Sequence, residues 1–162
     1  MPTASLSVPH FEQEDLASCV AACARMVLAF HGVALAEADL WLILGTGPRG
    51  TTARNLANLS ALGFDVQFEM ANLARLADLL KAGLPPVVLL DTGTLPYWDR
   101  DCYHAAVFVG IDNTAAFLND PAFATAPQQA PLAGFLLAWA ANKHTCAIIR
   151  PHLAAVGPVA AP

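Results

Sequence analysis

The sequence predicts an α+β fold in which helices come first along the chain and a sheet follows. Apolar residues recur at helical spacing from Val20 to Phe30, with no Gly or Pro between them, which indicates a buried helix. In the second half, aliphatic runs bounded by turn residues are typical of buried strands. Because strands and helices do not alternate regularly, a parallel sheet built from βαβ units is disfavoured.

The length and composition indicate one domain. A chain of 162 residues can bury a sizeable core but is too short for two domains of ordinary size. Hydrophobic residues make up 56% and charged residues only 13%, so the chain buries much of itself or offers an apolar surface to a protein partner. We expect a domain over residues 1–150 and a loose C-terminal tail over residues 151–162.

Several classes of protein are disfavoured by composition. No run of about 18 uncharged apolar residues could form a membrane span, and residues 1–15 lack the basic and apolar regions of a secretory signal. A net charge of −5 with only 8 Lys and Arg argues against a nucleic-acid partner. The four cysteines match no common zinc spacing, so we expect free thiols in a reducing, cytoplasmic compartment and no metal.

The first half of the chain is read as an extended segment followed by helices. Ser18 is a plausible N-cap for the first helix, which places Cys19 in its first turn, and Gly32 ends it. The glycine-rich stretch 45–50 lacks the Gly-Lys-Ser/Thr of a phosphate-binding loop and is read as a turn. We expect further helices over residues 36–44, from Thr51 or Thr52 to about residue 62, and over residues 72–81, with a strand at 65–70.

The second half is read as a sheet with one helix. We expect strands over residues 86–91, 102–112, 115–119 and 145–150, and a helix over residues 131–142. Phe135 and Trp139 lie four residues apart, and therefore on one face of that helix. Residues 92–101 are expected to form a loop, and residues 122–130 to be irregular.

The residues with catalytic potential are Gln13, Cys19, His104 and Asp120. Unpaired N–H groups and the helix dipole at a helix start favour a thiolate, and can lower a cysteine pKa from about 8.5 to roughly 3.5–7.5. Gln13 precedes Cys19 by six residues and carries an amide donor. His104 lies inside a strongly predicted strand and could act as a base, while Asp120 ends the neighbouring strand and could orient the imidazole.

The order and context of these residues resemble the bacteriocin-processing peptidases, papain-like domains that remove double-glycine leader peptides and are often fused to ABC exporters. Gln13 followed by Cys19 at the start of VAACARMVLAFHG is similar to the N-terminal motif of that family. HAAVFVGID from His104 is similar to its histidine block, and Asp120-Pro121 to the Asp-Pro that closes the next strand. The resemblance covers roughly residues 9–150.

The resemblance implies a papain-like fold and a cysteine peptidase that needs no cofactor. Its implied roles are nucleophile for Cys19, base for His104, orienting carboxylate for Asp120 and oxyanion donor for Gln13, with the N–H of Cys19 as second donor. The exporter-linked members carry Asp-Cys-Gly at the nucleophile, whereas this chain has Ser18-Cys19-Val20 and reads as a stand-alone domain. The double-glycine substrate therefore does not follow from the resemblance.

Three functions remain open at this point. The first is hydrolysis of a peptide or protein substrate through a Cys19 thioester, and the second is acyl transfer from the same thioester to an amine or thiol. The third is a papain-like module that binds a peptide without cutting it. Asp112 is the alternative to Asp120 as the orienting carboxylate.

Other polar and aromatic residues receive structural interpretations. Buried cysteines are common as small hydrophobes, so Cys23 and Cys146 are read as core residues, while Cys102 lies two residues from His104 and could sit near the site. Tyr97 and Trp98 are read as loop anchors, and Arg49 as a solvated side chain. The remaining histidines, namely His10, His31, His144 and His152, are read as surface or helix-end groups.

Overall fold

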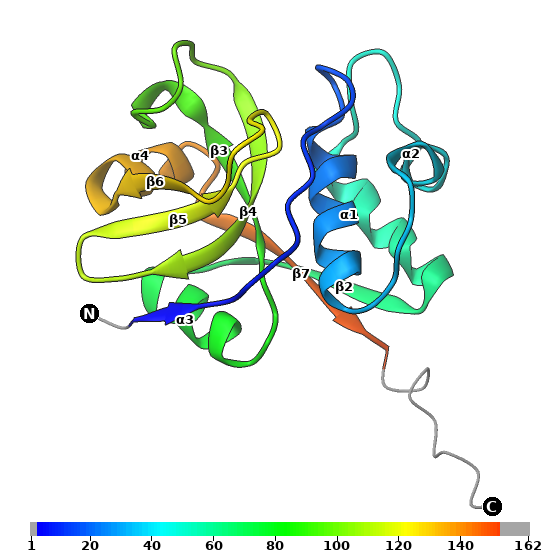
Figure 1. The fold of residues 1–162 in the computed structure, drawn as a ribbon, viewed down its shortest axis with the longest axis horizontal. Coiled ribbons are helices and arrows are strands. Elements are labelled where there is room, and N and C mark those ends of the chain that lie inside the picture. The colour runs from blue at the N-terminus through cyan, green and yellow to red at the C-terminus, as the bar shows by residue number, and fades with distance from the viewer. Residues whose placement is uncertain (1–2, 153–162) are drawn as a thin grey trace, which may run out of the picture.

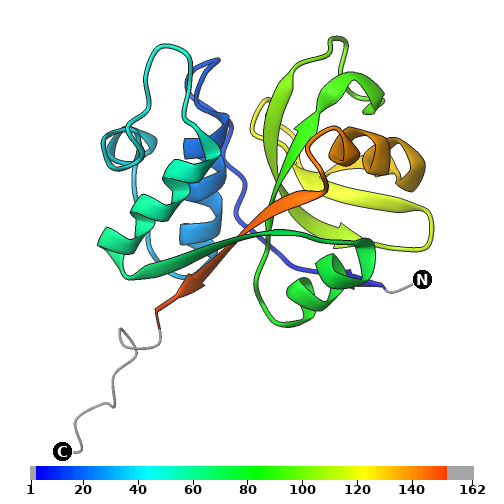
Figure 2. The ribbon, with the colours of Figure 1, turned by 180° about the vertical axis from the view of Figure 1, so that it is seen from behind.

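A computed structural model describes residues 3–152 and shows an antiparallel sheet that runs through both sides of the molecule (Figures 1 and 2). The strand order is β2-β7-β3-β4-β5-β6, and β1 pairs with β4. The strands are β1 (Ala4–Ser5), β2 (Phe64–Met70), β3 (Val87–Asp91), β4 (Tyr103–Ile111), β5 (Ala115–Asn119), β6 (Gln128–Pro131) and β7 (Thr145–Pro151). The helices are α1 (Cys19–Phe30), α2 (Glu37–Leu44), α3 (Leu73–Lys81), α4 (Leu132–Ala140), and the 3-10 helices η1 (Ala53–Leu62) and η2 (Thr92–Thr94).

The molecule has two halves joined by β2 and β7. We call α1, α2 and η1, with the segment that leads into α1, the helical half, and strands β3 to β6 with α3 and α4 the sheet half (Figure 1). The segment before α1 runs between the halves and is tied to the sheet half by backbone bonds. Leu6 donates to the carbonyl of Val109 at 2.8 Å, and Gln13 to the carbonyl of Pro121 at 2.7 Å.

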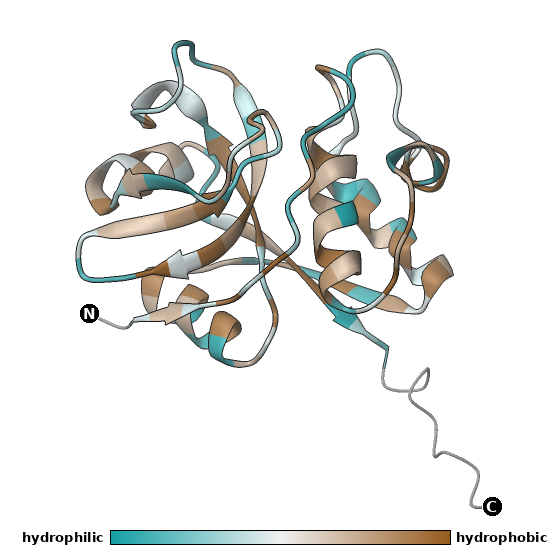
Figure 3. Ribbon diagram, in the orientation of Figure 1, coloured by the Kyte–Doolittle hydropathy of each residue, from teal (hydrophilic) through white to brown (hydrophobic). Residues whose placement is uncertain are grey.

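Two hydrophobic clusters pack against the two faces of the sheet. Ala105, Val107 and Val109 of β4 belong to the cluster that contains α1, whereas Ala106 and Phe108 belong to the cluster that contains α3 and α4. Because successive side chains of a strand point to opposite faces, a strand buried on both faces reads as a continuous apolar run. Hydrophobic residues accordingly fill α1 and β4, while hydrophilic residues gather on the loops (Figure 3).

The predicted class and most predicted elements are confirmed, and their ends lie within a few residues of the predicted ends. Phe135 and Trp139 share one face of α4, where both are fully buried and their rings stack at 5.6 Å. Each such burial is worth about 1.5–3 kcal/mol. Within residues 3–152, no helix has the length and apolar character needed to cross a membrane.

Several expectations about secondary structure were wrong in detail, and one is that residues 92–94, within the stretch 92–101 expected to be a loop, form the 3-10 helix η2. Residues 128–131 form β6, although the stretch 122–130 was expected to be irregular. Gln128 and Gln129 have no strand-like alternation, and β6 exists because β5 offers a free edge with which it pairs from Ala115 to Leu118. The helix after Thr52 is a 3-10 helix without a side-chain cap from Thr52. The loose tail was predicted from residue 151, but Pro151 ends β7 and the backbone N–H of His152 donates to the carbonyl of Gly63 at 2.7 Å; the rest of the predicted tail lies outside the described residues.

Candidate active site

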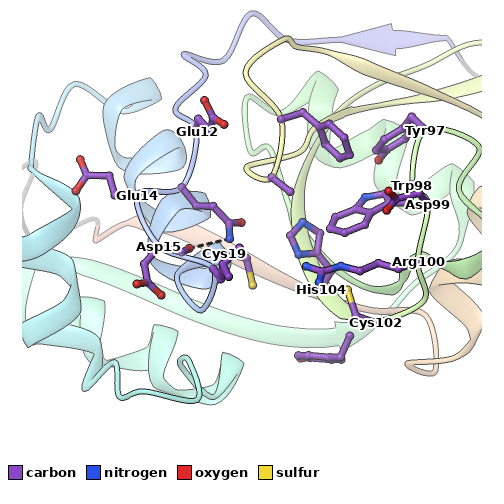
Figure 4. Close-up of a pocket in the computed structure, with 15 residues that line it drawn as sticks. Glu12, Glu14, Asp15, Cys19, Tyr97, Trp98, Asp99, Arg100, Cys102 and His104 are labelled. Atoms are coloured by element: carbon purple, nitrogen blue, oxygen red, sulfur yellow. Dashed lines mark hydrogen bonds between the residues drawn. The ribbon is translucent and has the colours of Figure 1, made fainter.

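A groove of about 700 Å³ opens between the two halves at the start of α1 (Figure 4). The helical half contributes Cys19 and residues 12–16, and the sheet half contributes residues 97–100, 102–104 and 122–123. A second hollow of about 490 Å³ adjoins this groove, and Leu16, Cys19 and Tyr103 line both of them. Cys19 therefore lies where the two hollows meet.

Cys19 is the first residue of α1, in the first turn as the sequence predicted, and it is half-buried. The predicted cap is only partly right, because Ser18 occupies the N-cap position but its side chain makes no capping bond. Its hydroxyl donates to the carbonyl of Asp15 at 2.8 Å and accepts the Asp15 N–H at 3.1 Å instead. Ser18 also has φ −106° and ψ 22° rather than the extended conformation of a capping residue. The first-turn N–H groups of α1 are thus left without a side-chain cap.

The turn at residues 47–50, whose Gly50 lines the second hollow, packs against the loop that leads into α1. Gly50 has φ +95°, a conformation that residues other than glycine rarely adopt. A Cβ at this position would lie 2.9 Å from the carbonyl oxygen of Ala17, two residues before Cys19. Glycine therefore lets the turn at 47–50 support the loop that leads into α1.

His104 and Asp120 form a buried pair in the sheet half. His104 lies on β4 with 4% of its surface exposed, and Asp120 follows β5 and is fully buried. His104 Nε2 lies 2.7 Å from Asp120 Oδ1. Since Nε2 is occupied by Asp120, Nδ1 is the nitrogen left for the thiol, and Figure 4 shows the ring and the Cys19 sulfur in the same groove.

The two charges stabilise each other. Burial alone would lower the pKa of His104, but hydrogen bonds and charges from Asp120 and Cys19 outweigh it and raise the pKa to about 9. Burial would likewise raise the pKa of Asp120, yet its bonds to His104, Trp98 and the Ala122 N–H hold that pKa below its ordinary value. Both shifts favour the charged forms, an imidazolium on His104 and a carboxylate on Asp120.

Gln13 lies in the groove on the segment before Cys19. Its side-chain amide nitrogen donates to the carbonyl of Asp15 at 2.8 Å, which leaves a second N–H on the same nitrogen. Its side-chain oxygen is buried and has no hydrogen-bond partner. The structure thus brings Gln13, Cys19 and His104 to one groove, with Asp120 behind the imidazole.

Trp98 is a site residue that the sequence interpretation missed. It was read as a loop anchor, but its indole N–H donates to Asp120 Oδ2 at 2.8 Å and its ring meets the His104 ring edge-on at 4.9 Å. Tyr97 also lines the groove, where its buried hydroxyl has no hydrogen-bond partner. Burial and the nearby Asp120 charge raise the pKa of Tyr97. No sequence signal links Trp98 to Asp120, because 22 residues separate them.

The alternative carboxylate, Asp112, is not near His104. It follows the far end of β4, where its Oδ1 accepts the N–H groups of Thr114 and Ala115 at 2.7 and 2.8 Å. These bonds hold the pKa of Asp112 below its ordinary value. Asp112 therefore shapes the turn between β4 and β5 and does not contact the imidazole.

The other cysteines differ in their surroundings. Cys23 and Cys146 are fully buried, and burial raises the pKa of both thiols, that of Cys146 to about 12. Cys102 lines the groove and lies 3.6 Å from the hydroxyl of Thr92. Arg49 is exposed beside the second hollow.

Of the histidines outside the site, one departs from its expected role. His10 was read as a surface or helix-end group, but it is half-buried and its Nε2 lies 2.7 Å from the carbonyl of Phe123. His31 does lie at a helix end, as the residue that follows α1. Among residues 3–152, no three His, Cys, Asp or Glu side chains gather as a metal site would require.

The sequence matches one known protein family, and the fold matches several solved structures. The family described as Peptidase C39 matches residues 7–149 of the chain. A search of curated protein sequences finds no match. The fold is similar to a double glycine motif protease from an AMS/PCAT transporter, solved with its leader peptide, with a TM-score of 0.72 and 20% identity over 93% of this chain and 99% of that one.

Two further solved structures have the same fold. One is the peptidase domain of Streptococcus ComA, a bifunctional ABC transporter of a quorum sensing pathway, with a TM-score of 0.73 and 20% identity over 88% of this chain and 98% of that one. The other is a C39-like peptidase from Bacillus anthracis, with a TM-score of 0.74 and 15% identity over 92% and 98% of the two chains.

Proposed function

Because the chain belongs to the peptidase C39 family of papain-like cysteine peptidases, we propose that it cleaves a peptide substrate with Cys19 as nucleophile and His104 as acid and base. The observation that carries this proposal is the groove in which Cys19 opens α1 opposite a buried His104–Asp120 pair. A cysteine attacks as its thiolate, and His104 is the base that lines the same groove as the Cys19 thiol.

The proposed reaction uses each group in turn. The Cys19 thiolate attacks the carbonyl carbon, and the resulting oxyanion is held by the Gln13 side-chain N–H and the Cys19 backbone N–H. Imidazolium of His104 protonates the leaving amine as the C–N bond breaks, which leaves a thioester on Cys19. A water molecule then gives its proton to the neutral imidazole and attacks the thioester, the C–S bond breaks, and the acid leaves while the Cys19 thiolate and the His104 imidazolium are restored. Asp120 and Trp98 hold the imidazole throughout.

We propose a chain with two consecutive glycines as the substrate. The two hollows on either side of Cys19 allow a peptide to pass across it. Leu16 and Tyr103 border both hollows and are 87% and 52% exposed, so a peptide that passes from one hollow to the other would meet these two side chains beside Cys19. The similar AMS/PCAT protease is described as acting on a double glycine motif.

The test is cleavage of a synthetic peptide library by the unsubstituted protein, Cys19→Ala and Cys102→Ala. Cys102→Ala is the matched control, because it removes the other thiol of the groove. We expect Cys19→Ala to abolish turnover and keep peptide affinity, Cys102→Ala to keep turnover, and Gly-Gly peptides to be cut faster than Ala-Ala peptides. Cleavage that survives in Cys19→Ala would refute the proposal. Transfer of the acyl group to an added amine instead of water would indicate an acyltransferase.

A further inference from the structure

Glu37 is a buried acidic residue with no place in the proposed reaction. It is the first residue of α2, and its exposed fraction is 0%. Carboxylates are rarely buried this completely unless they are well paired. Its Oε1 accepts the Trp41 indole N–H at 3.1 Å, and the backbone N–H of Glu14 reaches Oε1 at 3.3 Å and Oε2 at 3.2 Å.

The contact with Glu14 connects Glu37 to the groove. Glu14 directly follows Gln13, whose own backbone N–H donates to the carbonyl of Pro121 at 2.7 Å. Adjacent peptide groups are therefore fixed from opposite sides, one by the sheet half through Pro121 and the other by the helical half through Glu37. A backbone fixed at two adjacent points holds the base of the Gln13 side chain in place, and the bond from the Gln13 amide to the Asp15 carbonyl at 2.8 Å then sets where its second N–H points.

A second tie on the same segment is weaker. The Glu14 carboxylate lies 3.7 Å from Arg25, but its side chain is 61% exposed, and ion pairs exposed to solvent contribute little. The Glu37 contact is buried, and a hydrogen bond in the low-dielectric interior is electrostatically stronger than one exposed to water. Glu37 is thus the stronger constraint of the two on the backbone at Glu14.

We propose that Glu37 is a positioning residue that clamps the backbone at Glu14 and so aims the Gln13 side-chain N–H at the oxyanion. The inference rests on the proposed function in one respect, because it assumes that Gln13 is an oxyanion donor. Asp39 provides a comparison on the same helix: it also lies in the first turn of α2, but it is exposed. Removing either carboxylate changes its interaction with the helix dipole of α2. Only removal of the Glu37 carboxylate also removes the hydrogen bonds that hold the backbone N–H of Glu14.

The kinetic test combines Glu37→Leu with Gln13→Ala. We expect Gln13→Ala to lower kcat by about 10²–10³ and Glu37→Leu by about 10-fold or more, with KM changed less than about threefold in each. The double variant should be no worse than Gln13→Ala by more than about threefold, because both changes remove the same interaction. Alkylation of Cys19 by iodoacetamide should stay within about twofold of the unsubstituted protein in every variant.

Matched variants separate positioning from folding. Asp39→Asn should leave kcat unchanged, while Glu37→Gln should fall between the unsubstituted protein and Glu37→Leu, because the amide keeps one acceptor oxygen but turns an NH₂ group toward the Glu14 or Trp41 donor. Glu37→Gln also serves if Glu37→Leu does not fold. Losses that multiply in the double variant, or no loss of kcat in either Glu37→Gln or Gln13→Ala, would overturn the inference.

A second measurement does not depend on cleavage. Hydrogen exchange followed by mass spectrometry should show faster exchange over residues 12–18 in the Glu37 variants, with unchanged exchange over residues 20–30 of α1. Unchanged exchange over residues 12–18 would overturn the clamp while leaving the proposed peptidase intact. Absence of Cys19-dependent cleavage in the unsubstituted protein would refute the proposed function, and the exchange would still decide whether Glu37 holds Glu14.

Discussion

The two halves of the groove hold their polar groups in opposite ways. In the sheet half, both oxygens of Asp120 are occupied: Oδ1 by His104 and the Ala122 N–H, and Oδ2 by Trp98. In the helical half, Cys19 is half-buried, α1 has no side-chain cap, and the buried side-chain oxygen of Gln13 has no partner. The carboxylate behind the imidazole is thus fully bonded within the protein, whereas the start of α1 keeps backbone N–H groups without a side-chain cap.

This difference corresponds to the two tasks of a cysteine peptidase. The base must hold its tautomer and charge before substrate arrives, so a complete set of bonds around the imidazole serves it. An oxyanion site must instead leave donors unoccupied until charge develops in the transition state. We therefore expect substitutions in the sheet half to alter the state of the imidazole, and those in the helical half to alter only the reaction that forms an oxyanion.

The largest effect on the sheet half should come from His104→Ala. Loss of a general acid and base lowers kcat by about 10²–10⁴, and here it also removes the charge beside the thiol. Asp120→Asn should be milder, because the imidazole remains but is less well oriented. Single-turnover rates and the iodoacetamide reactivity of Cys19 should fall together in His104→Ala. We expect Cys19 to keep its alkylation rate in Gln13→Ala but to lose it in His104→Ala. An unchanged alkylation rate in His104→Ala would contradict this difference between the two halves.

The pH dependence of stability should come from the same pair. The pKa of His104 is raised from 6.5 to about 9, so its contribution to stability is complete below about pH 6.5 and is lost as the pH rises through 9. The loss can reach about 1.4 kcal/mol per pH unit within that window. For Asp120, whose pKa is lowered, stability is lost only as the pH falls below its ordinary range. Urea unfolding at pH 6.5 and 9 should show the first decrease, and His104→Ala should lack it.

The smallest effect should come from Trp98→Phe. The change keeps an aromatic ring near His104 but removes the N–H that binds Asp120. A hydrogen bond to a charged group contributes about 1.5–3 kcal/mol, and we expect the free energy of unfolding to fall by that order. Tyr97→Phe is the comparison, because it keeps the ring and removes a buried hydroxyl that is close enough to Asp120 to feel its charge but makes no hydrogen bond of ordinary geometry. Equal losses in the two variants would show that the bond from Trp98 to Asp120 contributes no more than an unbonded polar group of the same groove.

Local patterns in the sequence determined the order of elements and the positions of the proposed nucleophile and base. Helical spacing after Cys19 and the apolar run around His104 are properties of neighbouring residues, which is why α1 and β4 could be predicted. The placement of Asp120 beside His104 also follows from short-range pairing, because β4 and β5 form one hairpin. Their joint interpretation as a catalytic site depended on a family resemblance, since the spacing alone left Asp112 open.

Only the tertiary structure decided which groups support those residues. Trp98 reaches Asp120 across 22 residues and Glu37 reaches Glu14 across 23, and no periodicity relates positions so far apart. Ser18 shows the same limit at close range, because its hydroxyl could bind either the helix or Asp15, and packing of the loop selected Asp15. Hydrogen-bond partners are chosen by the folded surroundings, whereas helices and strands are favoured by the side chains of their own segment.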